Sequence, residues 1–146
     1  MQKKLLLALT GLFLFLQTSC NRSEQDEPRT CARNFCQAFF NFNYSDALKY
    51  CASGEAGWLK IFISNLLQED MDSIRHISVT PQFNIEDITY RGDSCALAII
   101  KVHSVYYFDT IGRPGHFVKE GIYNLSMIRE KGKWRIRTGD LRQNGK

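Results

Sequence analysis

The sequence predicts an α+β domain in which three N-terminal helices pack on a curved antiparallel sheet of about four strands. From Thr30 to Glu69 apolar residues recur every three or four positions, as on one face of a helix. Beyond Ile74 they alternate with polar residues, as on one face of a strand. Helices followed by consecutive strands are typical of α+β proteins and not of doubly wound ones. A chain of 146 residues, 44% of them hydrophobic, is large enough for one core.

Three helices are predicted between residues 30 and 69. The first covers residues 30–42, with Thr30 as a suitable N-cap. Its apolar face consists of Cys31, Ala32, Phe35, Cys36, Phe39 and Phe42. A second, shorter helix is expected to start at residue 45 or 46 and to end at Gly54, and a third is expected over residues 55–69.

Four strands are predicted after the helices, over residues 77–90, 95–109, 116–129 and 134–138. Pro81 favours an edge position for the first strand, because proline cannot donate to a ladder. The apolar phase of this strand changes near Glu86 and Asp87, which predicts a β-bulge. Turn residues separate the strands at 91–94, 112–115 and 130–133. The domain is therefore expected over residues 30–140, and residues 141–146 are expected to form a frayed tail.

Residues 1–19 have the pattern of a signal peptide rather than of a domain segment. Lys3 and Lys4 precede an apolar run of about a dozen residues that ends at Leu16. This run is too short to cross roughly 30 Å of hydrocarbon as a helix. We therefore expect the chain to be exported and residues 1–19 to be removed.

The segment Gln17-Thr18-Ser19-Cys20 resembles the lipobox of bacterial lipoproteins, which are cleaved before a cysteine that is then acylated. Gln17 departs from the pattern, which usually has a branched apolar residue there. The resemblance implies a lipid anchor at Cys20 and a location in the bacterial cell envelope, at the outer membrane. Residues 20–29 would then be the lipidated cysteine and a polar tether. The acidic residues of this tether resemble a signal that sends lipoproteins to the cell surface. They do not decide whether the protein faces the periplasm or the outside of the outer membrane. The alternative is a plain secretory signal, with Cys20 an ordinary thiol.

The charge of the mature chain argues against nucleic acid as a partner. Without Lys3 and Lys4, 17 of the 19 basic residues remain against 15 acidic ones. An exported chain with so small an excess of positive charge lacks the electrostatic footprint of a nucleic-acid-binding protein.

Two segments carry a resemblance to a known fold: Asn43–Tyr50, directly after the first helix, and the hairpin Tyr123–Ile136 with its Lys131-Gly132-Lys133-Trp134 turn. In this order they resemble the nuclear transport factor 2-like domain, the cone-shaped cystatin-like fold, which many small lipoproteins of unknown function share. The resemblance covers residues 30–140. It implies that the helices fill the concave face of the sheet, and that the outer face could form a homodimer.

Four cysteines lie outside the lipobox, at positions 31, 36, 51 and 95. An even number of cysteines in an oxidising compartment favours disulfides. If the first two helices form an antiparallel hairpin, Cys36 and Cys51 come level, and a Cys36–Cys51 bridge is predicted, with Cys31–Cys51 as its nearest competitor. The alternative is that the four are free, buried thiols. No Cys or His pair has the spacing of metal ligands, so neither a metal nor another cofactor is expected.

Enzymes with this fold, such as ketosteroid isomerase, place acids, bases and phenols inside the cone. The comparable residues here are His103, Tyr107, Asp109, Asp87 and Tyr123, together with Tyr106. The strand period predicts that His103, Val105, Tyr107 and Asp109 share one face and that Tyr106 lies on the other. They would serve a small pocket enzyme of the isomerase or dehydratase type. A cone filled by Phe35, Phe39, Trp58 and Phe62 would argue against it.

The sequence favours a non-enzymatic binding or interaction module over this enzyme. Its ligand would be a protein or a small molecule, bound at the mouth of the cone or on the outer face of the sheet. The pocket enzyme remains the alternative.

Overall fold

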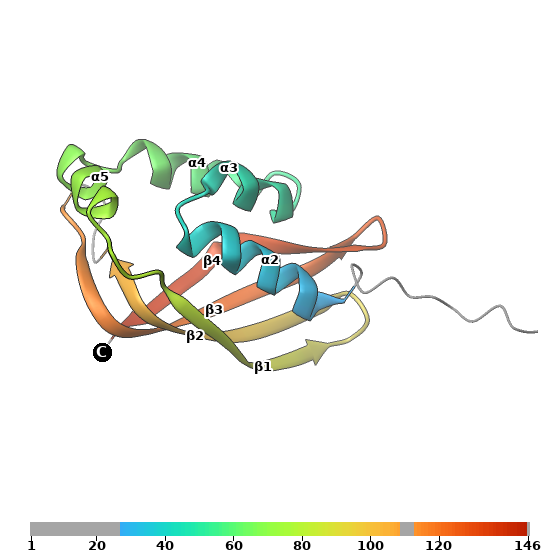
Figure 1. The fold of residues 1–146 in the computed structure, drawn as a ribbon. Coiled ribbons are helices and arrows are strands. Elements are labelled where there is room, and N and C mark those ends of the chain that lie inside the picture. The colour runs from blue at the N-terminus through green and yellow to red at the C-terminus, as the bar shows by residue number, and fades with distance from the viewer. Residues whose placement is uncertain (1–26, 109–112, 146) are drawn as a thin grey trace, which may run out of the picture.

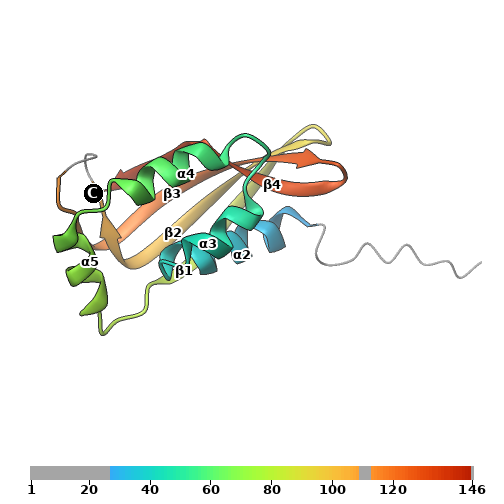
Figure 2. The same ribbon diagram turned by 90° about the horizontal axis from the view of Figure 1, so that it is seen from above.

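The computed structural model describes residues 27–108 and 113–145, and the side chains among them as far as Gly139. Its sheet contains β1 (Gln82–Arg91), β2 (Cys95–Tyr107), β3 (His116–Glu130) and β4 (Lys133–Gly145), antiparallel and in chain order. The helices all lie over one face of this curved sheet (Figures 1 and 2). The predicted α+β class and the curved four-stranded sheet are therefore confirmed.

Helix α2 (Pro28–Phe40) begins two residues earlier than predicted, with Glu27 and not Thr30 as N-cap. Pro28 explains the difference, because proline is favoured in the first turn, where its missing N–H would have no partner. The buried face of α2 contains the expected apolar residues up to Phe39. Helix α3 (Tyr44–Ala47) follows, and its N-cap Asn43 accepts a hydrogen bond from the backbone N–H of Asp46 at 3.3 Å. It continues as a 3-10 turn over Leu48–Tyr50.

The predicted third helix is wrong as a single element: it is divided into α4 (Ala56–Ser64) and α5 (Gln68–Arg75). At the break, the side chains of Ser64 and Asn65 both donate to the carbonyl of Ile61, at 2.8 Å, and so compete with the backbone. Asp70 then accepts a hydrogen bond from the N–H of Leu67 at 2.8 Å and starts the next helix.

Strand β1 begins at Gln82 and not at Ile77, so its predicted start is wrong. Val79, expected to face the core, is 56% exposed. The predicted bulge is confirmed, because the β1–β2 register shifts between Ile85 and Asp87. The bulge keeps Phe83 and Ile88, on either side of it, packed against the core.

The alternation of β2 is interrupted at Ser104, which has a positive φ of 57°. Val102 is buried and His103 is not, but Val105 is buried again. The prediction that His103 and Val105 share a face is therefore wrong. The β2–β3 register continues unchanged past Ser104, so the interruption comes from the backbone conformation of this residue and not from an inserted one.

The β1–β2 and β3–β4 hairpins have different loops. Arg91 pairs with Cys95 around a three-residue turn, whereas the expected turn at Lys131 and Gly132 has positive φ at both residues. Beyond it, β4 continues to Gly145, which pairs with Gly121. The prediction of a frayed tail over residues 141–146 is thus wrong for residues 141–145, because the long β3 gives them a partner.

The core lies between the helices and the concave face of the sheet. Its largest fully buried side chains include Tyr123, Phe35, Leu59, Ile100 and Leu125. In the described part of the chain, no helix combines the length and apolar character that crossing a membrane requires.

Candidate functional site

The predicted catalytic residues do not converge on one site. His103 lies on the outer face of the sheet, where its ring is 3.6 Å from the carboxylate of Glu120. Asp87 is exposed on β1 and accepts a hydrogen bond from Thr89 at 2.8 Å. Tyr107 packs its ring on that of His116. Asp109 lies outside the described residues.

Of His103, Tyr107, Asp87 and Tyr123, only Tyr123 has its side chain in the core. It is 1% exposed, and its ring meets that of Phe40 edge-on with centroids 4.9 Å apart. The sequence prediction of His103, Tyr107, Asp87 and Tyr123 as one constellation therefore has no geometric support among the described residues.

The structure instead places a buried carboxylate at the wide end of the cone. Asp70, only 1% exposed, lies 2.9 Å from the hydroxyl of Tyr106 and 2.8 Å from the N–H of Gly115. Burial, and then the hydrogen bond to Asp70, raise the pKa of Tyr106. Burial also raises the pKa of Tyr44, and the negative charge of Asp70 adds to that shift. Sequence reasoning missed Asp70, and its position three residues after Leu67 would have been the signal.

The cone itself is filled with aromatic side chains. Phe35 stacks on Phe39, which contacts Phe62, which in turn stacks on Trp58. A cavity of about 10 Å³ lies beside them, and Phe39 and Phe62 line it together with Val105 and further aromatic residues. This is at most the room of a single water molecule. A cone filled by Phe35, Phe39, Trp58 and Phe62 is the arrangement that would argue against a small pocket enzyme.

The four cysteines of the domain are free thiols, so the predicted Cys36–Cys51 bridge is not formed. Cys31 and Cys51 instead donate to the carbonyls of Trp134 and Ala47, at 3.2 and 3.5 Å. Burial raises the pKa of each of these two thiols to about 11. Burial also raises the pKa of Cys36. No group of three or more His, Cys, Asp or Glu among the described residues is arranged to hold a metal ion.

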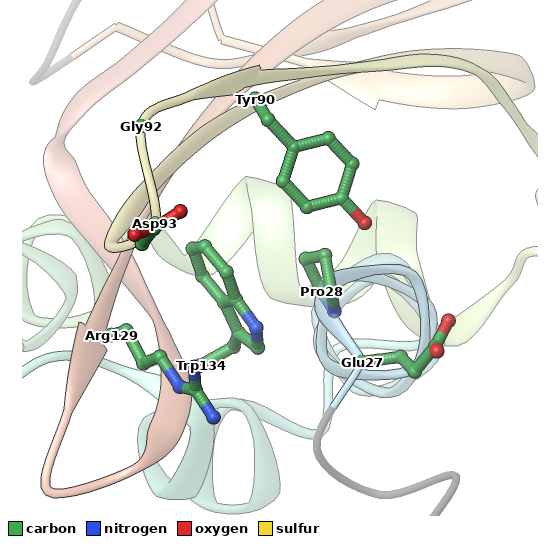
Figure 3. A pocket seen from close by; sticks show the side chains of 7 residues that line it. All are labelled: Glu27, Pro28, Tyr90, Gly92, Asp93, Arg129 and Trp134. Atoms are coloured by element: carbon green, nitrogen blue, oxygen red, sulfur yellow. The ribbon is translucent and has the colours of Figure 1, made fainter. Parts of the chain in front are cut away.

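An open cleft lies at the opposite, narrow end of the cone. The start of α2 forms one side of it, the β1–β2 turn another, and the β3–β4 hairpin the third. It has a volume of about 560 Å³ and is lined by Glu27, Pro28, Tyr90, Gly92, Asp93, Arg129 and Trp134 (Figure 3). We call this feature the narrow-end cleft. Its volume lies within the range of roughly 300–1,000 Å³ found for small-molecule sites.

Two aromatic rings form the wall of the narrow-end cleft. The rings of Tyr90 and Trp134 meet edge-on, with centroids 6.2 Å apart and planes at 76°. Trp134 is 7% exposed, whereas Tyr90 is 56% exposed. The cleft therefore has a fixed indole at its base and an accessible phenol ring at its mouth (Figure 3).

The polar groups of the narrow-end cleft are largely unused by the fold. Among the described residues, the indole N–H of Trp134, the Tyr90 hydroxyl and the side chains of Glu27 and Asp93 have no hydrogen-bond partner. No buried side-chain nitrogen or oxygen of this part lacks a partner, so the free indole N–H must be accessible from the cleft. Arg129 uses only its Nε, which donates to the carbonyl of Gly132 at 3.3 Å.

Sequence reasoning did not identify the narrow-end cleft, because its residues come from three segments far apart in the chain. The one local signal was an aromatic residue at the end of a strand beside each hairpin turn, Tyr90 and Trp134.

Comparison with solved structures identifies the architecture. A protein of unknown function from Shewanella oneidensis MR-1, described as NTF-2 like, superposes with a TM-score of 0.51 over 75% of this chain and 90% of its own, at 11% identity. The chain has the NTF-2-like fold. A putative calcium/calmodulin dependent protein kinase II association domain from Xanthomonas campestris covers 81% of the chain and 84% of its own, with a TM-score of 0.46 and 12% identity. No protein-family model matches the sequence, and no curated protein is similar to it.

Proposed function

We propose that this chain is an exported lipoprotein, anchored through Cys20 in the bacterial cell envelope, whose NTF-2-like domain is a non-enzymatic binding module. The narrow-end cleft is its binding site. One observation carries the choice of this cleft over the cone: the cavity in the cone measures about 10 Å³, whereas the narrow-end cleft offers about 560 Å³ beside the rings of Tyr90 and Trp134.

The chemistry of the two ends supports a binding module over an enzyme. At the wide end, the carboxylate of Asp70 is occupied by hydrogen bonds from Tyr106, Gly115 and Leu67. A carboxylate held in this way serves to connect chain segments and has no room for a substrate beside it. At the narrow end, by contrast, donors and acceptors face the solvent without partners. Such groups are available to a ligand at little cost to the fold.

A ligand screen by NMR tests the site. The full chain, isotopically labelled, is titrated with a library of small neutral, cationic and anionic compounds while the indole N–H signals are followed. We expect binders to shift the Trp134 signal and to leave that of Trp58, in the filled cone, in place. Shifts confined to Trp58 and the tyrosines of the cone would favour the pocket enzyme and would contradict the proposal.

The lipid anchor is tested separately in cells. Metabolic labelling with a palmitate analogue is expected to mark the wild-type protein and not a Cys20→Ala variant, which should leave the membrane fraction. Ser19→Ala, which keeps a small residue before the cysteine, is the matched control and should be labelled normally. Equal labelling of the Cys20→Ala variant would refute the anchor.

A homodimer through the outer face of the sheet is a second proposal, supported by Ile122, which is 40% exposed at the centre of that face. Light scattering of the wild type and of an Ile122→Glu variant is the measurement. The variant should be monomeric where the wild type is a dimer, and a monomeric wild type would rule the proposal out.

A further inference from the structure

We infer that the ligand of the narrow-end cleft is a neutral saccharide. The inference rests on the proposed function, because it names the chemical class of the ligand at the same site. Three properties of the cleft carry it: the exposed aromatic surface, the mixture of unused donors and acceptors, and the balance of charge.

The aromatic wall suits the apolar face of a sugar ring. Tyr90 is 56% exposed although it lies beside a buried indole, and Trp134 holds it edge-on. An aromatic face carries partial negative charge and attracts groups with partial positive charge, such as the C–H bonds on one side of a pyranose. A ring held by a neighbour loses little side-chain freedom when a ligand packs on it.

The polar lining supplies both kinds of hydrogen-bonding group that a polyol needs. Each sugar hydroxyl can donate one hydrogen bond and accept others. The indole N–H of Trp134 and the free guanidinium nitrogens of Arg129 can donate, and the carboxylates of Glu27 and Asp93 can accept. A cleft for an apolar ligand would leave these groups buried without partners, which is costly.

The charges in the cleft disfavour ionic ligands of either sign. Glu27 and Asp93 give two negative charges against the one positive charge of Arg129, so an anion such as a phosphate meets a net repulsion. A cation would be attracted by the two carboxylates, but it would also meet the guanidinium of Arg129, which is paired directly across the ladder from Trp134. A neutral ligand with many hydroxyls satisfies both carboxylates and the guanidinium without this conflict.

The test uses the full chain in a detergent without a sugar headgroup, because a glycoside detergent would compete. Maltotriose, cellotriose, triacetylchitotriose and mannotriose are titrated separately up to roughly 50 mM, which exceeds the millimolar dissociation constants of weak sites. The readout is the fluorescence of a Trp58→Phe variant, which leaves Trp134 as the single tryptophan. If that variant folds poorly, the indole N–H signal of Trp134 in the wild type gives the same information.

The matched variants are Tyr90→Ala and Asp93→Asn in the cleft. Their controls are Phe117→Ala, another exposed aromatic residue on a strand, and Asp72→Asn, another exposed carboxylate. We expect saturable binding of at least one saccharide, weakened about tenfold or more by each cleft variant and unchanged in both controls. We also expect the affinity to be nearly independent of salt, because the ligand carries no charge.

Three results would overturn the inference, and they have different consequences for the proposed function. If none of the saccharides perturbs Trp134 but tetramethylammonium or a lysine peptide does, the ligand is a cation and the binding site stands. If these probes and the anionic compounds of the ligand screen all leave Trp134 unperturbed, the binding site fails together with the saccharide. Saccharide binding that survives both cleft variants would place the sugar elsewhere and would also refute the inference.

Discussion

The hydroxyl of Tyr106, near the end of β2, lies 2.9 Å from the carboxylate of Asp70, on α5, and the two residues are 36 positions apart in the sequence. The same carboxylate accepts the N–H groups of Leu67 and Gly115, both at 2.8 Å. One side chain thus joins the start of α5, the end of β2 and the segment before β3. These three segments close the wide end of the cone.

Replacement of Asp70 by asparagine is expected to destabilise the protein by about 2–4 kcal/mol. The amide nitrogen would have to face at least one of the N–H or O–H donors, which would leave that buried donor without an acceptor. Urea unfolding followed by circular dichroism measures the effect. Asp72→Asn, on the exposed side of the same helix, should change the stability by less than about 0.5 kcal/mol. Equal effects of the two variants would show that the Asp70 contacts do not stabilise the fold.

Gly115 is expected to tolerate no side chain. A Cβ there would lie 2.6 Å from a ring carbon of Tyr106 and 2.7 Å from the carbonyl oxygen of Tyr107. Because one of these atoms belongs to the backbone, Gly115→Ala should cost about 2 kcal/mol or more. Gly57→Ala is the control, since its Cβ meets nothing within 4 Å in a helix, and it should be neutral or stabilising. The same unfolding midpoint for both variants would contradict this packing.

Alkylation with iodoacetamide distinguishes free thiols from the disulfide that the sequence favoured. In the folded protein we expect Cys95 to react first, because Cys31, Cys36 and Cys51 are buried. After unfolding without reductant, mass spectrometry should show all of these cysteines alkylated. A pair that stays unmodified until a reductant is added would reveal a bridge and would contradict the structure.

The stability is expected to fall between about pH 9 and pH 11. Cys31 and Cys51 have a pKa of about 11 in the folded state, against an ordinary value of 9.0. In this window the unfolded chain has lost these thiol protons while the folded chain keeps them, so a rise in pH favours unfolding. Below pH 9 the two protonated thiols make their full contribution to the stability, and this contribution is lost as the pH passes 11.

The measurement is the free energy of unfolding at pH 8, 9, 10 and 11, with Cys31→Ala as the matched variant. The slope should be smaller in the variant, since one shifted thiol is gone, and each thiol contributes at most about 2–3 kcal/mol. Identical slopes would show that other groups, and not this thiol, cause the decline.

Much of the fold could be predicted from local signals. The bulge after Ile85 and the turn at Lys131 and Gly132 follow from residues next to each other in the chain, and both are confirmed. The positive φ of Ser104 within β2 could not be predicted in the same way. The break between α4 and α5 does have local signals, in Ser64, Asn65 and Asp70, but the apolar periodicity runs across it. The contact between Asp70 and Gly115 joins segments 45 positions apart, and no local pattern indicates it.

Less of the candidate site than of the fold could be predicted from the sequence. The predicted catalytic set assumed an unbroken alternation along β2, and the positive φ of Ser104 breaks it just beyond His103. The narrow-end cleft depends on the meeting of Glu27, Tyr90 and Trp134, which no spacing along the chain indicates. An exposed tyrosine and a nearly buried tryptophan look alike in an alternating pattern, and only the packing distinguishes them.

The position of Glu27 in the narrow-end cleft limits how far the cleft can lie from the membrane. Only seven residues lead from Cys20 to Glu27, a reach of at most about 25 Å when fully extended. A chain acylated at Cys20 would therefore hold the mouth of its cleft close above the lipid headgroups. Molecules displayed on the same leaflet would then meet it at an effective concentration in the millimolar range. At that local concentration even a site with weak affinity would be occupied. A competing ligand free in solution would need a millimolar concentration to displace the molecule bound from the leaflet.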